Sequence, residues 1–170
     1  MSYPVLQRGD ILCCHDPYSP LADLISLVEG CHWSHVALAL SPDRAIQALG
    51  RGVTPTPMRK FTWKSGRVKV VRIKPELIMP GGLEVATAFA EHQKGKGYDY
   101  LLIPELLWLY VSGQRGTEVL PERRNKYICS ELVAQPLWNF AHFRFNDVIP
   151  PENTTPADIA ESNKVEVVWE

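Results

Sequence analysis

Long uninterrupted apolar runs are missing from this sequence of 170 residues. The longest apolar stretch runs from Tyr98 to Val111 and is interrupted by Asp99, Pro104 and Glu105. It falls short of the ~20 apolar residues that a helix needs to span a bilayer. We therefore expect no transmembrane segment and interpret the stretch as a core helix. The wall of an acyl-binding pocket and a membrane-contacting surface are the alternatives.

An excess of charge of either sign is also missing. The 18 basic and 19 acidic residues leave a formal net charge of -1. Proteins that bind nucleic acid usually carry a basic patch or stripe, and adsorption to an anionic membrane needs a similar excess. We therefore expect no nucleic-acid partner. The oligomeric state is not defined by the sequence.

Cysteine is scarce, and its four residues are Cys13, Cys14, Cys31 and Cys129. Adjacent cysteines do not easily pair with each other, so the set does not resemble the disulfide framework of a small secreted domain. The first ten residues also lack a basic segment followed by an apolar one, which is the pattern of a signal peptide. We expect a reducing, cytoplasmic location, with non-classical export as the alternative.

The hydrophobic pattern predicts one domain over residues 1–170, because 45% of the residues are hydrophobic and the chain is too short for two comfortable cores. Alternating or short apolar runs predict strands at 11–14, 35–40, 44–50, 67–74 and 165–169. Helical spacing predicts helices at 19–29, 83–93, 101–110, 128–140 and 156–162. The polar interval 112–125 is expected to be a surface loop. This order favours an α+β fold with a mostly antiparallel sheet packed against helices.

The candidate nucleophile is Cys129, in the segment YICSELV at 127–133. If a helix begins here, its unpaired backbone N–H groups and the positive end of its dipole favour a thiolate. The same N–H groups can bind the oxyanion of a tetrahedral intermediate. A lone free cysteine is more often a small buried apolar residue, so the prediction depends on partners.

His35 and Gln47 are the predicted partners. His35 opens a strand, Gln47 lies in the next one, and a turn near Ser41 to Asp43 places the two side chains almost opposite each other. The carbonyl of Gln47 would accept the Nδ1–H of His35, which leaves Nε2 to take the thiol proton. The non-catalytic alternative is that Gln47 is an ordinary surface or edge-strand residue.

Segments in this order resemble the permuted branch of the NlpC-type papain-fold superfamily, which includes the YiiX/YebB-like bacterial proteins and is distantly related to lecithin retinol acyltransferase. The resemblance spans nearly the whole chain. It is carried by GDIL at 9–12, WSHVAL at 33–38, AIQA at 45–48, Gly52-Val53, GYDY at 97–100, YICSELV at 127–133 and TPADI at 155–159.

The resemblance implies a circularly permuted papain-like fold, with a mostly antiparallel sheet or a small barrel packed against helices. It implies a triad of Cys129, His35 and Gln47, in which Gln47 departs from the Glu or His often found in relatives. Tyr98, Ser34 and Ser130 are expected to line the substrate or oxyanion site. No cofactor is implied.

The sequence thus predicts a cysteine hydrolase that cleaves an amide or peptide bond, cell-wall peptide included, through a thioester. One alternative is a lipid acyltransferase or acyl hydrolase with the same triad; another is a catalytically silent binding module on this fold. A zinc site is a further rival, but the spacing of its candidate ligands lacks the usual Cys-x2-Cys pattern. These ligands are Cys13, Cys14, His15, Cys31, His32 and His35.

Overall fold

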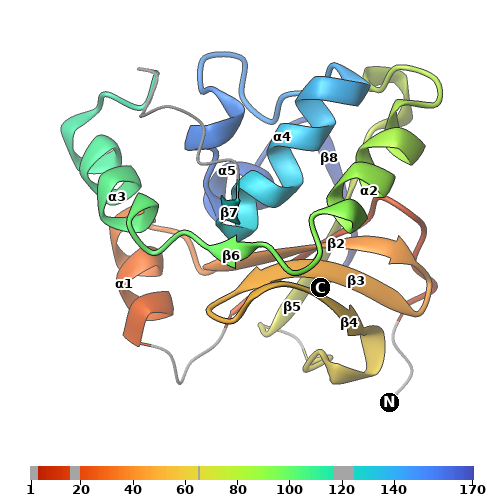
Figure 1. The fold of residues 1–170 in the computed structure, drawn as a ribbon. Helices are drawn as coiled ribbons and strands as arrows, with labels where there is room; N and C mark the ends of the chain where they lie inside the picture. Colours follow the sequence, from red (N-terminus) through yellow and green to blue (C-terminus); the bar gives the residue numbers. More distant parts are fainter. Residues whose placement is uncertain (1–3, 16–19, 65, 117–124) are drawn as a thin grey trace.

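A six-stranded antiparallel sheet is the centre of the fold (Figure 1). The computed structural model describes residues 4–15, 20–64, 66–116 and 125–170. The strand order is β4-β3-β2-β1-β5-β8. The strands are β1 (Ile11–Cys14), β2 (His35–Ser41), β3 (Arg44–Leu49), β4 (Gly52–Pro57), β5 (Val68–Ile73) and β8 (Val165–Trp169).

Strand β4 is the element of this sheet that the sequence pattern missed. It contains Pro55 and Pro57, and proline cannot donate a backbone hydrogen bond to a ladder. The strand tolerates both prolines because it lies at the edge of the sheet and pairs with β3. The other five strands lie where the sequence predicts them.

Helices cover one face of the sheet. α2 (Gly82–His92) and α4 (Cys129–Ala141) pack against each other, and α4 lies over β2 and β3 (Figure 1). α1 (Pro20–Glu29) and α3 (Leu102–Ser112) pack together at one side of the sheet. Shorter elements complete the chain: η1 (Met58–Lys60), η2 (Pro75–Leu77), η3 (Pro151–Asn153) and α5 (Pro156–Ala160).

The predicted helices are found with shifts of a residue or two at their ends, as is usual for helix boundaries. Most of the predicted loop 112–125 lies outside the described residues, because 117–124 are not described. In the described part of the chain, no helix is long and apolar enough to cross a bilayer. The stretch around α3 is an 11-residue helix with Ile103, Leu106 and Leu109 buried.

Two apolar clusters lie on the two faces of the sheet. The larger one joins alternate residues of β2, such as Val36 and Leu38, to the buried side of α4. The smaller one joins Ala37 and Ala39 to Met58 of η1 on the opposite face. Successive residues of a strand point to opposite faces, so His35 belongs to the same side of β2 as the smaller cluster.

The sheet is open, and the alternative of a small barrel is wrong. Closing a barrel requires the two edge strands to pair with each other. Here β4 pairs with β3 at one edge and β8 pairs with β5 at the other. The central position of β1, between β2 and β5, keeps the two edges apart.

A short parallel pair links the helical layer to the nucleophile segment. β6 (Gly97–Tyr98) pairs with β7 (Lys126–Tyr127), which places Tyr98 beside Tyr127. β7 leads directly into the start of α4. Gly52 fixes the distance between this pair and β4, because its φ is +102° and a Cβ there would lie 2.4 Å from the carbonyl oxygen of Lys96.

Candidate active site

Cys129 occupies the first position of α4, as the sequence predicted. The preceding residue, Ile128, has an extended backbone and no side chain caps the helix. The first N–H groups of a helix have no partner within the helix, so they face the space around the thiol. Only 6% of Cys129 is exposed, which keeps most water away from the sulfur.

The surroundings of Cys129 favour its thiolate. Burial raises the pKa of this thiol, but attraction to His35, a hydrogen bond from the His35 side chain and the backbone N–H of Val36 lower it below its usual value on balance. The other three cysteines differ: burial raises the pKa of Cys13 strongly, that of Cys14 to about 12 and that of Cys31 to about 11. Cys129 is therefore the thiol whose surroundings lower its pKa, whereas those of Cys13, Cys14 and Cys31 raise theirs.

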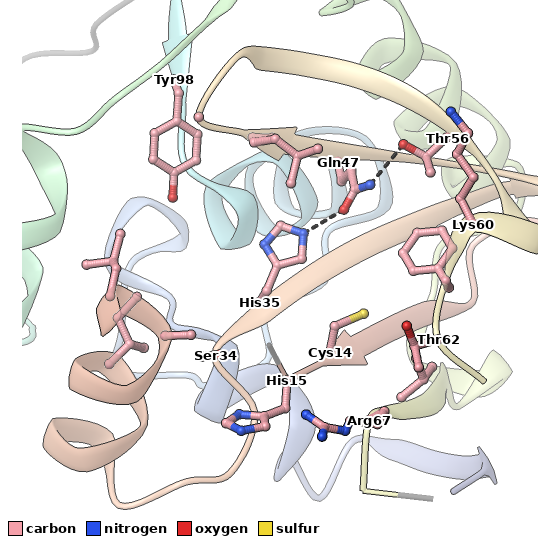
Figure 2. Close-up of a pocket in the computed structure, with 18 of the residues that line it drawn as sticks. Cys14, His15, Ser34, His35, Gln47, Thr56, Lys60, Thr62, Arg67 and Tyr98 are labelled. Carbon is pink, nitrogen blue, oxygen red and sulfur yellow. Dashed lines mark hydrogen bonds between the residues drawn. The ribbon is translucent and has the colours of Figure 1, made fainter. Parts of the chain in front are cut away.

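Gln47 orients the imidazole of His35. The Nε2 of His35 and the Oε1 of Gln47 are 2.7 Å apart, and the Nε2 of Gln47 donates to the Oγ1 of Thr56 at 2.8 Å (Figure 2). Gln47 is 7% exposed, so this chain of hydrogen bonds is shielded from solvent. An amide oxygen only accepts; hence the bond requires His35 to carry its proton on Nε2.

The expected tautomer of His35 is therefore corrected. The sequence predicts Nδ1 toward Gln47 and Nε2 toward the thiol, whereas the structure gives Nε2 to Gln47 and leaves Nδ1 for Cys129. The reason is the position of the sulfur, which lies against the backbone N–H of Val36. Nδ1 is the ring nitrogen nearer the main chain, so it faces a thiol in that position.

The register of the hairpin also differs from the expectation. Leu38 pairs with Ile46, and continuing this ladder places Gln47 beside Ala37 instead of His35. His35 and Gln47 are thus diagonal neighbours on one face, a distance that a long glutamine side chain spans. Thr56, which completes the chain, was missed because β4 was not recognised.

Ser34 and Ser130 lie next to His35 and Cys129 in the chain and are almost fully buried. Within the described residues, neither hydroxyl has a hydrogen-bond partner. Buried polar groups are normally satisfied, so these two unpartnered hydroxyls beside Cys129 are available to a bound molecule. Tyr98 is half-buried with its ring against Tyr100, and burial followed by the nearby Cys129 raises the pKa of its hydroxyl.

Two hollows meet at these residues. A groove of about 750 Å³ is lined by His35, Gln47 and Thr56 (Figure 2). A cavity of about 30 Å³ reaches Cys129 and Ser130 and has apolar walls from α1 and α3. Ser34 and Tyr98 line both hollows, so a molecule in the groove can approach the thiol between them.

Glu29 lies near Cys129, a position that the sequence did not predict. Its side chain lines the small cavity with Cys129, and its Oε2 accepts a hydrogen bond from the N–H of Ala157 at 3.1 Å. Burial raises the pKa of this carboxyl to about 7. Its negative form raises the pKa of Cys129. In the sequence it is only the last residue of an amphipathic helix, so no local signal marked it.

The candidate zinc ligands do not come together. Among the described residues, no three His, Cys, Asp or Glu side chains are grouped so that they could hold a metal ion. His15 and His32 stack with their ring centroids 4.2 Å apart, but the Nε2 of His32 is 2.7 Å from the carbonyl oxygen of Gly66. This donor set does not fit a zinc site, which needs at least three protein ligands.

Comparisons with known proteins identify the fold. No protein-family model matches the sequence, and no match is found among curated proteins. Among solved structures, the chain is similar to one described as the metalloprotein yiiX from Escherichia coli O157:H7. That likeness has a TM-score of 0.69 and 16% sequence identity, and it covers 98% of each chain. The protein is therefore an α+β protein with a YiiX-like fold.

Proposed function

We propose that this protein is a cysteine hydrolase of the permuted papain-like type, with Cys129 as nucleophile, His35 as base and Gln47 as the residue that positions His35. The observation that carries the proposal is the thiol of Cys129, whose pKa is lowered by its attraction to and hydrogen bond with His35. The 2.7 Å contact between His35 and Gln47 supports it. Together these give the relay of nucleophile, base and orienting group that thiol catalysis needs.

The reaction follows from these positions. The thiolate of Cys129 attacks the carbonyl carbon of an amide, and the Nδ1–H of His35 protonates the leaving nitrogen as the C–N bond breaks. Water, deprotonated by His35, then hydrolyses the thioester. The N–H groups at the start of α4 and the hydroxyls of Ser34 and Ser130 supply donors for the oxyanion, each worth about 3 kcal/mol or more where it is aligned.

Site-resolved alkylation tests the proposal. Iodoacetamide is added at pH 6.5, and the labelling rate of each cysteine is followed by peptide mass spectrometry. Cys129 should react fastest, and His35→Ala should slow it about 10²-fold, the lower range for loss of a catalytic base. Cys14→Ala is the matched control, because Cys14 lies opposite His35 in the β1–β2 ladder. Faster labelling of Cys14 than of Cys129 would overturn the proposal.

An acyl-lipid substrate for the same triad is the second candidate. The apolar wall of the small cavity at Cys129, formed by Ile25, Ile103 and Leu106, favours it. Esters of 4-nitrophenol separate the two candidates. A rate that rises from acetate to octanoate supports an acyl lipid, and a rate that falls supports a peptide or other short amide. Release of the acyl group as free acid marks a hydrolase, and its transfer to added glycerol marks an acyltransferase.

A catalytically silent protein with this fold would show a different pattern. Its Cys129 would alkylate slowly, and the rate would not depend on His35.

The four cysteines are free thiols in the structure, which supports a reducing compartment for the proposed enzyme. The description of the neighbouring structure as a metalloprotein adds no step here, because the described residues lack a suitable ligand group.

A further inference from the structure

The charged side chains of the groove lining are all cationic. Lys60, Lys64 and Arg67 line the groove, and no carboxylate is among the described residues of the lining. None of the three forms an ion pair with a described residue. The imbalance is local, because the chain as a whole has 18 basic and 19 acidic residues. Figure 2 shows Lys60 beside Thr56 at one end of the lining and Arg67 beside His15 at another.

The groove wall also holds a polar atom that has no hydrogen-bond partner among the described residues, the Nδ1 of His15. This nitrogen is buried, and His15 lines the groove near Arg67. A cleft with one sign of charge concentrates field lines and attracts ions of the opposite sign. The groove is therefore suited to a ligand with a carboxylate or a phosphate.

The position of the cations relative to the triad indicates which half of the substrate is anionic. The thiol lies on the side of Ser34 and Tyr98, where the wall continues into the apolar cavity with Ile25. Figure 2 shows His35 between Tyr98 and Lys60. With the acyl half of a substrate against the apolar cavity at Cys129, the leaving half lies in the groove that Lys60, Lys64 and Arg67 line.

We propose that the substrate is an acyl compound whose leaving half bears an anionic group, a carboxylate or a phosphate, attracted into the groove by the positive charge of Lys60, Lys64 and Arg67. This inference rests on the proposed function. It narrows the substrate to, for example, an N-acyl amino acid or a short peptide cleaved near its carboxylate end. The acyl half lies against the apolar wall formed by α1 and α3.

Two aryl esters test the charge of the leaving half. The acetyl esters of 4-hydroxybenzoate and 4-hydroxybenzamide differ in that half alone, and kcat/KM is measured for both. The ratio should favour the benzoate in the natural protein. It should fall about fivefold for each cation in contact with the anion that is lost, the Coulomb value at ~4 Å in water. Salt at about 1 M should remove the preference, because the Debye length is then ~3 Å.

The matched variants are two lysine pairs with the same change in charge. Lys60→Gln with Lys64→Gln alters the groove, whereas Lys94→Gln with Lys126→Gln alters exposed lysines that do not line it. The ratio should fall in the first double variant and stay constant in the second. An equal fall in both, or no fall in either, would overturn the inference while leaving ester hydrolysis intact. A preference seen instead for phenyl hydrogen succinate, which is anionic in its acyl half, would overturn it as well.

Failure to hydrolyse either ester would count against the proposed function. A binding measurement then tests separately whether the groove prefers an anion. Benzoate, phenyl phosphate and benzamide are tested for protection of Cys129 from iodoacetamide. The two anions should protect at concentrations about fivefold or more below benzamide, and Lys60→Gln with Lys64→Gln should reduce that difference. Stronger protection by phenyl phosphate than by benzoate assigns a phosphate, and the reverse assigns a carboxylate. Equal protection by all three would refute the inference.

Discussion

Replacing Gln47 tests whether the triad works as a unit. Gln47→Ala removes the acceptor of the His35 Nε2–H and the donor to Thr56, which lie 2.7 and 2.8 Å away. Each buried group left without a partner costs about 1–3 kcal/mol. We expect the alkylation rate of Cys129 at pH 6.5 to fall about 10- to 100-fold, which corresponds to ~1.4–2.8 kcal/mol.

Gln47→Glu should act in the opposite direction. A carboxylate accepts a charge-assisted hydrogen bond from the His35 imidazolium, and such bonds are about twice as strong as neutral ones. The gain of ~1 kcal/mol should raise the alkylation rate of Cys129 about fivefold. It acts by stabilising the imidazolium that accompanies the thiolate. The Thr56 hydroxyl can turn to donate to the new carboxylate.

The assay is the pH profile of Cys129 alkylation from pH 5 to 9, with urea unfolding as a check that each variant folds. Thr56→Val should reduce the rate by a smaller factor than Gln47→Ala, because Gln47 keeps its bond to His35. Thr54→Val is the matched control, since Thr54 pairs with Gln47 in the ladder but is not its side-chain hydrogen-bond partner. A Gln47→Ala protein with the natural rate and profile would refute the reasoning.

Two further predictions concern stability. The pKa of Glu29 is raised to about 7 from 4.5, so the folded state holds a proton that the unfolded state has lost; stability should fall by about 3 kcal/mol as pH rises from about 4.5 to 7. Glu29→Gln should flatten that slope in urea titrations, and an unchanged slope would refute the assignment. Gly52→Ala should cost about 2–4 kcal/mol from strain and overlap with Lys96. The control Gly95→Ala, at φ +87° with no atom near its Cβ, should cost about 1–2 kcal/mol.

Local chemistry made much of this fold predictable. The apolar periodicity of α2 and α4 survives folding because each helix buries one side against the sheet. The start of α4 at Cys129 was predictable because the polar segment 112–125 gives way to the apolar pattern of YICSELV at 127–133. β4 escaped detection because its two prolines argue against a strand, and only its edge position makes them acceptable.

The sequence by itself determined which residue types are available: an imidazole at the start of a strand, a thiol at the start of a helix and an amide in the neighbouring strand. It could not determine which ring nitrogen meets which partner. That depends on the register between β2 and β3 and on where α4 places its sulfur against Val36.

Tertiary structure alone decided the rest of the site. It brought Glu29 to the cavity beside Cys129 and placed Lys60, Lys64 and Arg67 in the lining of one groove. These contacts join residues far apart in the chain, and a local pattern carries no information on which distant side chains will share a low-dielectric space. The sequence supplies the residues of the site, but their pKa values and partners are set only when folding removes water from between them.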